Sequence, residues 1–103
     1  MRGFENFGFI LAPRALVNRK LKIGWMYREP PETAGDSGWR VFTGDEDEAE
    51  MDNGSYFGFY DVKTILEIDP SVENCLHSPE CTAFIRDESG KLVPAKYDPP
   101  TEE

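Results

Sequence analysis

Hydrophobic and polar residues alternate with a period of two in several short segments of the chain. Aromatic and β-branched side chains dominate these segments, as is typical of strands whose side chains point alternately to opposite faces of a sheet. Gly, Pro, Asn and Asp residues separate them and favour turns. The pattern therefore predicts up to six strands, over residues 7–12, 22–29, 39–43, 56–60, 81–86 and 91–97.

The second and third predicted strands show the clearest alternation. Trp25 and Tyr27 share one face of the second strand, and Trp39 and Arg40 point to opposite faces of the third. Antiparallel pairing of these two strands is the simplest topology. Residues 30–38, which are rich in Pro, Gly and small polar residues, are expected to form a mobile loop between them.

Between the fourth and fifth predicted strands the apolar residues change to helical spacing. Asp61 is a typical N-cap and predicts a helix over residues 62–68. The pair Asp69-Pro70 predicts the start of a second short helix that ends near residue 76. The order of elements predicts an α+β fold with a small, mostly antiparallel sheet of five to six strands and two short helices between the fourth and fifth.

The length of 103 residues fits one domain with one hydrophobic core. We expect a folded domain over residues 7–97, a flexible N-terminus over residues 1–6 and a disordered acidic tail over residues 98–103. The chain has neither a run of about 20 apolar residues nor the pattern of a signal peptide. These features favour a soluble, cytoplasmic protein that does not contact a membrane.

Charge is unevenly distributed along the chain. Residues 1–28 carry six basic residues and one acidic residue, whereas the whole chain has a net charge of −9, so the remaining residues carry −14. A strongly negative surface repels the phosphate groups of nucleic acids and attracts basic proteins. We therefore expect a protein partner, and no nucleic acid.

The negative charge is concentrated in residues 45–52, where six of the eight residues are acidic. The run does not match the EF-hand pattern for calcium, because Ala49 and Glu50 occupy positions that require other residues. It is interpreted as a solvated loop, a nonspecific site for divalent cations, or a face that docks on a basic partner. The docking interpretation fails if the basic N-terminal third of the chain neutralises the carboxylates of this run. The six acidic residues are Asp45, Glu46, Asp47, Glu48, Glu50 and Asp52.

Aromatic residues are numerous for a domain of this size, and two short helices cannot cover both faces of the sheet. Most of the rings are expected in the core. One or two are expected on the face that the helices leave uncovered. An exposed Trp or Tyr beside an Arg is typical of interface hot spots. The candidates lie in the second and third strands: Trp25, Tyr27, Arg28, Trp39 and Arg40.

No pattern in the sequence indicates catalysis or a cofactor. Cys75, His77 and Cys81 supply at most three metal ligands, and their spacing matches no zinc motif. His77 is the only histidine and has no identifiable partners for nucleophilic catalysis. Motifs for a nucleophile elbow, a phosphate-binding loop and a dinucleotide site are absent from the sequence. We expect a protein that is not an enzyme, has reduced thiols, and binds no metal or cofactor.

Several segments of the chain resemble a family of small bacterial domains. They are GWMYREPP at 24–31, DSGWRVFTGDEDEAEMD at 36–52, FGFYDVKTILEIDPSV at 57–72, and Ser-Pro at 78–79 leading into AFIRDE at 83–88. Together they span about residues 8–93 and resemble type thirty-three of the immunity proteins of polymorphic toxin systems. The resemblance implies an α+β fold and the neutralisation of a toxin made by the same or a neighbouring cell.

Charge, aromatic content and resemblance together favour an inhibitor that binds a basic toxin stoichiometrically. The acidic run and the neighbouring aromatic and arginine side chains are the predicted contact surface. The alternative is a housekeeping or regulatory domain that binds a peptide or a small ligand in a pocket between the sheet and the helices. The oligomeric state stays open in both interpretations.

Overall fold

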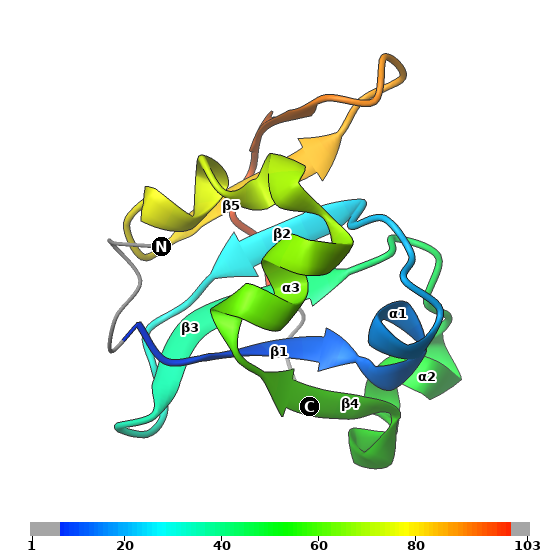
Figure 1. Ribbon diagram of the computed structural model, residues 1–103, viewed down its shortest axis with the longest axis vertical. Helices are drawn as coiled ribbons and strands as arrows, with labels where there is room; N and C mark the ends of the chain where they lie inside the picture. Colours follow the sequence, from blue (N-terminus) through cyan, green and yellow to red (C-terminus); the bar gives the residue numbers. More distant parts are fainter. Residues whose placement is uncertain (1–6, 100–103) are drawn as a thin grey trace.

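Six β-strands form one open sheet in a computed structural model of the chain, which describes residues 7–99 (Figure 1). Across the sheet the strands are β4 (Phe57–Tyr60), β1 (Phe9–Pro13), β3 (Asp36–Phe42), β2 (Trp25–Arg28), β5 (Thr82–Arg86) and β6 (Leu92–Ala95). β1 and β3 are parallel, and the other neighbouring strands are antiparallel. The predicted fold class is confirmed. The predictions for residues 1–6 and 100–103 lie outside the described residues.

β2 and β3 pair in the predicted antiparallel direction. Trp25 lies opposite Phe42, and Arg28 lies opposite Trp39. Because residues directly opposite each other project to the same side of a sheet, this register places Trp25 and Phe42 on one face and Trp39 on the other. The register therefore decides which aromatic side chains share a surface.

β3 begins at Asp36, three residues earlier than predicted, so the prediction of a mobile loop through Gly38 is wrong for residues 36–38. The Asp36 carboxylate accepts hydrogen bonds from the N–H groups of Glu32 at 3.0 Å and Gly38 at 2.9 Å. It also accepts from the Arg40 side chain at 2.7 and 2.9 Å. These contacts order a segment whose composition alone is typical of a loop.

Gly38 and Gly44 both have a positive φ, of +90° and +96°, but their surroundings differ. A Cβ atom at Gly38 would lie 2.2 Å from the carbonyl oxygen of Glu29, whereas a Cβ at Gly44 would meet nothing within 4 Å. We expect Gly44→Ala to lower the free energy of unfolding by about 1–2 kcal/mol, the cost of the left-handed conformation, and Gly38→Ala by about 3 kcal/mol or more. Urea denaturation measures both values. Equal losses would contradict the close approach at Gly38.

Short helices and 3₁₀ turns connect the strands: α1 (Arg14–Asn18), α2 (Glu48–Asp52), η1 (Gly54–Tyr56), α3 (Val62–Ile68), η2 (Pro70–Val72) and η3 (Cys75–His77). α3 confirms the helix predicted over residues 62–68, and Asp61 caps it by accepting from the N–H of Thr64 at 2.9 Å. The second predicted helix is instead the two turns η2 and η3, which suit segments too short for an α-helix. No helix within residues 7–99 has the length and apolar content needed to cross a bilayer.

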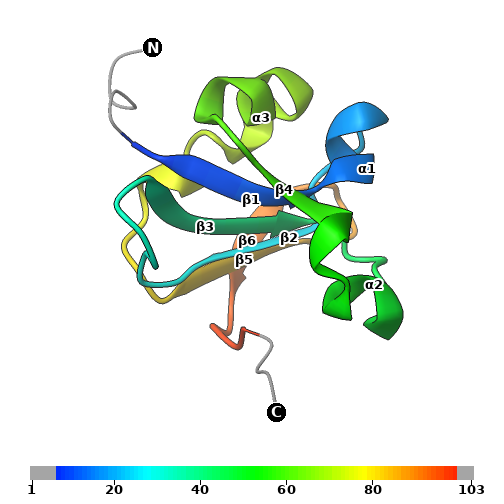
Figure 2. The ribbon, with the colours of Figure 1, turned by 90° about the horizontal axis from the view of Figure 1, so that it is seen from below.

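The helices are divided unequally between the two faces of the sheet (Figure 2). α1 and α3 lie on one face, where the main core cluster includes Ile10, Leu16, Trp39, Ile65 and Leu76. α2 lies at the margin of the other face. This second face, which carries Tyr27, Phe42 and Ala83, is called the helix-free face below. It is covered by fewer helices than the face that carries α1 and α3.

Candidate functional site

The acidic run forms a capped helix, so its interpretation as a loop is wrong for residues 48–52. The side chain of Asp47 accepts from the N–H of Glu50 at 2.8 Å, and the side chain of Glu50 accepts from the N–H of Asp47 at 3.1 Å. This reciprocal capping box starts α2. The sequence already contains the pattern of a capping box, because the N-cap residue Asp47 is followed three positions later by Glu50.

Glu46 holds the acidic segment against the end of β3. Its carboxylate accepts from the N–H of Thr43 at 2.8 Å, from the hydroxyl of Thr43 at 2.9 Å and from the N–H of Gly44 at 3.0 Å. Glu46, Asp47 and Glu50 therefore have structural roles. Three exposed carboxylates have no such bond and face solvent. They belong to Asp45 and to the residues at the two ends of α2, Glu48 and Asp52.

The acidic segment takes no part in the ion pairs of the described chain. The ion pairs within residues 7–99 join Arg40 to Asp36 and Glu29, and Arg86 to Asp69. None of them includes a residue of the run 45–52. The basic residues of the described N-terminal third therefore form no ion pair with these carboxylates. Carboxylates without such a pair can attract a basic partner.

An aromatic cluster lies beside α2 on the helix-free face. The Trp25 ring stacks on Phe42 with centroids 4.8 Å apart, and Tyr27 lies 5.3 Å from Trp25 and 5.8 Å from Phe42. Phe57 meets Phe42 edge-on at 5.9 Å. Met51 of α2 packs against the same cluster. Met51 thus joins the acidic helix to the aromatic cluster, and we call the two together the acidic–aromatic face.

Three large apolar side chains are strongly exposed in the described chain: Phe9 and Ile85, each 48% exposed, and Phe59, 59% exposed. Ile85 is the cross-strand partner of Trp25, and Phe59 is two residues from Phe57, so both share the face of the aromatic cluster. Phe9 shares it as well, because its neighbour Ile10 belongs to the core on the opposite face. The three side chains lie on one side of the sheet but on different strands, with Phe59 on the edge strand β4 and Ile85 on β5. Exposed large apolar groups are candidates for contact with a partner. Phe9, Phe59 and Ile85 were not among the predicted site residues, although strict alternation along these strands places them on the side opposite the core.

Trp39 is corrected from a surface residue to a core residue. Its side chain is 0% exposed in the main core cluster, and its indole N–H donates to the carbonyl of Leu76 at 3.2 Å. The alternation along β3 turns it toward the face that carries the helices. It therefore has no surface to offer a partner.

Arg40 and Tyr27 are likewise buried rather than exposed, at 3% and 6%. Arg40 donates to Asp36 and, at 2.6 Å, to Glu29. The hydrogen bonds from Arg40 hold the pKa of Asp36 well below its usual range. Desolvation by burial raises the pKa of Tyr27. Arg40 and Tyr27 therefore lie beneath the surface of the helix-free face and do not form its outer layer.

Arg28 is half-buried and serves as a structural link. Its Nε donates to the carbonyl of Ser37 at 3.0 Å, and its Nη1 donates to the carbonyl of Ser78 at 2.9 Å. Its guanidinium also lies over the ring of Trp39, 5.9 Å from the centroid. Of the five aromatic and arginine candidates, Trp25 alone combines partial exposure with a position at the edge of the aromatic cluster.

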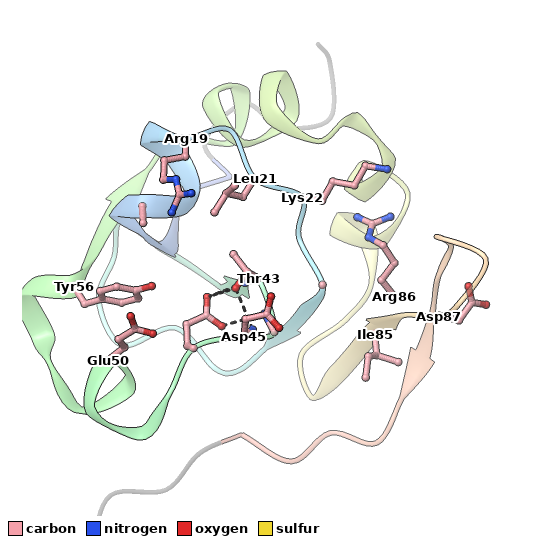
Figure 3. Close-up of a pocket in the computed structure, with 14 residues that line it drawn as sticks. Arg19, Leu21, Lys22, Thr43, Asp45, Glu50, Tyr56, Ile85, Arg86 and Asp87 are labelled. Atoms are coloured by element: carbon pink, nitrogen blue, oxygen red, sulfur yellow. Dashed lines mark hydrogen bonds between the residues drawn. The ribbon is translucent and has the colours of Figure 1, made fainter.

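A groove of about 840 Å³ separates the acidic segment from basic side chains of the N-terminal third (Figure 3). Asp45 and Glu50 line one wall, and Arg19 and Lys22 line the other. Desolvation, followed by the negative charge of Glu50, raises the pKa of Tyr56 in this groove. The groove lies at one end of the sheet and has walls of opposite charge. Between the helices and the centre of the sheet lies the main core cluster, and a second cavity of about 540 Å³ lies between the turns η2 and η3 and the start of β6.

The profile of the Immunity protein Imm33 domain matches residues 10–96. This chain belongs to the Imm33 immunity protein family. The resemblance seen over residues 8–93 is thereby confirmed. No curated protein and no solved structure matches the chain. The match includes α2 and the aromatic cluster, so the acidic–aromatic face is part of the Imm33 domain itself.

The two cysteines of the Imm33 chain differ in their surroundings. Cys75 is buried in the core, which raises the pKa of its thiol, and Cys81 is exposed. No disulfide joins these two free thiols. Within residues 7–99 no group of three or more His, Cys, Asp or Glu side chains is arranged to hold a metal ion.

Proposed function

We propose that this Imm33 protein neutralises a cognate toxin of a polymorphic toxin system by binding it stoichiometrically, without catalysis. Membership of the immunity protein family over residues 10–96 carries the proposal. The contact surface that we propose is the acidic–aromatic face. Its apolar part includes Trp25 and Ile85, and its charged part is α2 with the preceding Asp45.

The chemistry of this face favours a basic toxin. Exposed carboxylates attract a positively charged partner over several ångströms, accelerate the encounter and select the orientation of docking. Aromatic and aliphatic side chains that lose their contact with water then supply the affinity. A toxin that acts on nucleic acids has a basic cleft for phosphates, and the carboxylates of Asp45, Glu48 and Asp52 are suited to occupy such a cleft.

We place this encounter in the cytoplasm. The free thiols of Cys75 and Cys81 agree with a reducing compartment. The complex that we expect contains one immunity protein and one toxin, because the acidic–aromatic face is a single surface on this domain.

Capture followed by a growth assay tests the function. The tagged full chain is used to isolate proteins from its native bacterium, and a captured basic protein that arrests growth when expressed alone is taken as the cognate toxin. Coexpression of this chain is expected to restore growth, and the two purified proteins are expected to elute as a one-to-one complex. The proposal fails if the folded chain gives no rescue, or if a metabolite copurifies in place of a protein.

Reversing exposed charges on the acidic–aromatic face is expected to slow association with this toxin. Asp45→Lys combined with Asp52→Lys leaves the capping residues intact, and a lysine at the end of α2 is compatible with the helix dipole. We expect the association rate constant in low salt to fall by about tenfold or more. Stopped-flow fluorescence measures this rate.

The matched control carries the same change of charge on the other side of the sheet. Glu67 and Glu73 are exposed in and after α3, so Glu67→Lys combined with Glu73→Lys changes the net charge equally. This control is expected to keep most of the association rate. Equal slowing by both double variants would assign the effect to net charge and not to the acidic–aromatic face.

A further inference from the structure

The edge of the sheet formed by β6 is interrupted by a proline at one of its outward-facing positions. Residues in an antiparallel ladder direct their N–H and C=O groups alternately toward and away from the neighbouring strand. The N–H of Arg86 donates to Gly24 at 2.9 Å, away from β6, so its partner Leu92 directs its own N–H outward. Pro94 follows two residues after Leu92, so its backbone nitrogen also points outward. Because proline has no N–H, this edge is blocked where an added strand needs a donor.

The other edge, formed by β4, is open (Figure 1). The N–H of Phe9 donates to Gly35 at 2.8 Å on the β3 side of β1, so the next residue, Ile10, faces β4. Ile10 is paired with Tyr60, which therefore faces inward to β1. The alternation then directs the N–H and C=O groups of Phe59 outward, to the free edge.

Phe59 is the central residue of this open edge. Its outward N–H and C=O groups have no partner among residues 7–99, and its ring is 59% exposed on the helix-free face. The carbonyl of Phe57 also points outward, whereas the N–H of Phe57 donates to Gly54 and ends η1. A free donor and free acceptors beside an exposed ring are the features by which a sheet edge accepts an extended peptide.

We propose that β4 receives an extended, basic segment of the toxin as a seventh strand of the sheet. This proposal rests on the proposed immunity function and states how the partner is held. The exposed acids Asp52 and Asp61 precede and follow the segment that contains β4, which favours basic residues at the ends of the added strand. A second copy of this chain carries the same net charge of −9, so pairing of two β4 edges brings like charges together.

Hydrogen exchange of the wild-type chain tests the proposal without any substitution. In the free protein the amide of Phe59 is expected to exchange rapidly, while the amides of Gly58 and Tyr60, which face β1, are protected. Addition of the captured toxin, inactivated at its own active site, is expected to slow exchange at Phe59 by at least about tenfold, because the added strand accepts its N–H. Unchanged exchange at Phe59 in the complex overturns the proposal.

Two variants of Phe59 separate strand pairing from contact with the ring. Phe59→Ala removes the ring and keeps the N–H, whereas Phe59→Pro removes both and is tolerated at an edge position whose N–H faces outward. We expect Phe59→Pro to bind the inactivated toxin about tenfold more weakly than Phe59→Ala. Circular dichroism verifies that each variant is folded, and if Phe59→Pro is not, the exchange measurement on the wild type decides.

The outcomes distinguish this proposal from the function on which it rests. If the wild type binds and rescues growth, and Phe59→Pro binds as tightly as Phe59→Ala, the seventh strand is overturned and the immunity function stands. If the wild type neither binds nor rescues, both fall. Protection of Phe59 that rises with protein concentration in the absence of toxin assigns the edge to a second copy of the chain and also overturns the proposal.

Discussion

Arg40→Met is expected to lower the free energy of unfolding by about 3–5 kcal/mol, as is typical when one partner of a buried ion pair is removed. The Arg40 side chain is almost fully buried and donates to Asp36 at 2.7 and 2.9 Å and to Glu29 at 2.6 Å. Without it the buried carboxylate of Asp36 loses its counter-charge and two charge-assisted hydrogen bonds. Chemical denaturation at pH 7 measures the loss.

Two further variants show whether the loss comes from burial and geometry. Arg40→Lys keeps the charge but loses the fork that contacts both oxygens of Asp36, so we expect an intermediate loss of about 1–2 kcal/mol. Arg19 is exposed and forms none of the ion pairs described above, and Arg19→Met is expected to change stability by less than about 0.5 kcal/mol. A loss in Arg40→Met no larger than that in Arg19→Met would contradict the structural role of Arg40.

Acid should remove the difference between the wild type and Arg40→Met. The hydrogen bonds from Arg40 lower the pKa of Asp36 in the folded chain relative to the unfolded value of about 4. A lowered pKa stabilises the folded state above the unfolded pKa, and this contribution is lost as the pH falls below about 4 toward the folded pKa. We therefore expect the difference between the two stability curves to shrink as the pH falls below about 4 toward the folded pKa of Asp36.

Much of the fold followed from local patterns in the sequence. Alternation over β2 and β3 predicted both strands, because period-two order is set by each strand itself, and their antiparallel pairing followed as the simplest topology. Asp61 predicted the start of α3, since a cap acts on the residues that follow it directly. The early start of β3 was missed because it depends on hydrogen bonds that the Asp36 carboxylate accepts from Arg40 and from the N–H groups of Glu32 and Gly38. A composition rich in loop residues does not reveal these bonds.

The candidate site was predicted less well than the fold, for a physical reason. Alternation shows that Trp39 and Arg40 point to opposite faces, but the docking of α1 and α3 determines which face is covered. Arg40 lies on the helix-free face and is still buried, because Asp36 and Glu29 bind it there. Neither fact is local in sequence. The acidic run was found from composition alone, and its helix was missed although the capping pattern of Asp47 was present.

Trp25→Ala is expected to weaken binding of the toxin by about 30-fold or more, which corresponds to the loss of about 2 kcal/mol typical of an interface hot spot. Trp25 stacks on Phe42 at 4.8 Å, lies opposite the exposed Ile85 and is itself partly exposed. A partner that covers this ring removes a large apolar area from water without having to order a flexible side chain. Isothermal titration with the inactivated toxin measures the affinity, and growth rescue by coexpression is expected to decline in parallel.

The second tryptophan supplies the control, because it lies on the opposite face of the same sheet. Trp39→Phe removes the bond from the indole N–H to Leu76 and some core volume, so we expect it to lower the free energy of unfolding by about 1–3 kcal/mol. Its toxin affinity, measured where the variant is folded, should stay within about twofold of the wild type, since neutral changes outside an interface leave binding intact. If Trp39→Phe weakens binding as much as Trp25→Ala does, the toxin does not discriminate between the two faces, and the acidic–aromatic face is not the docking surface.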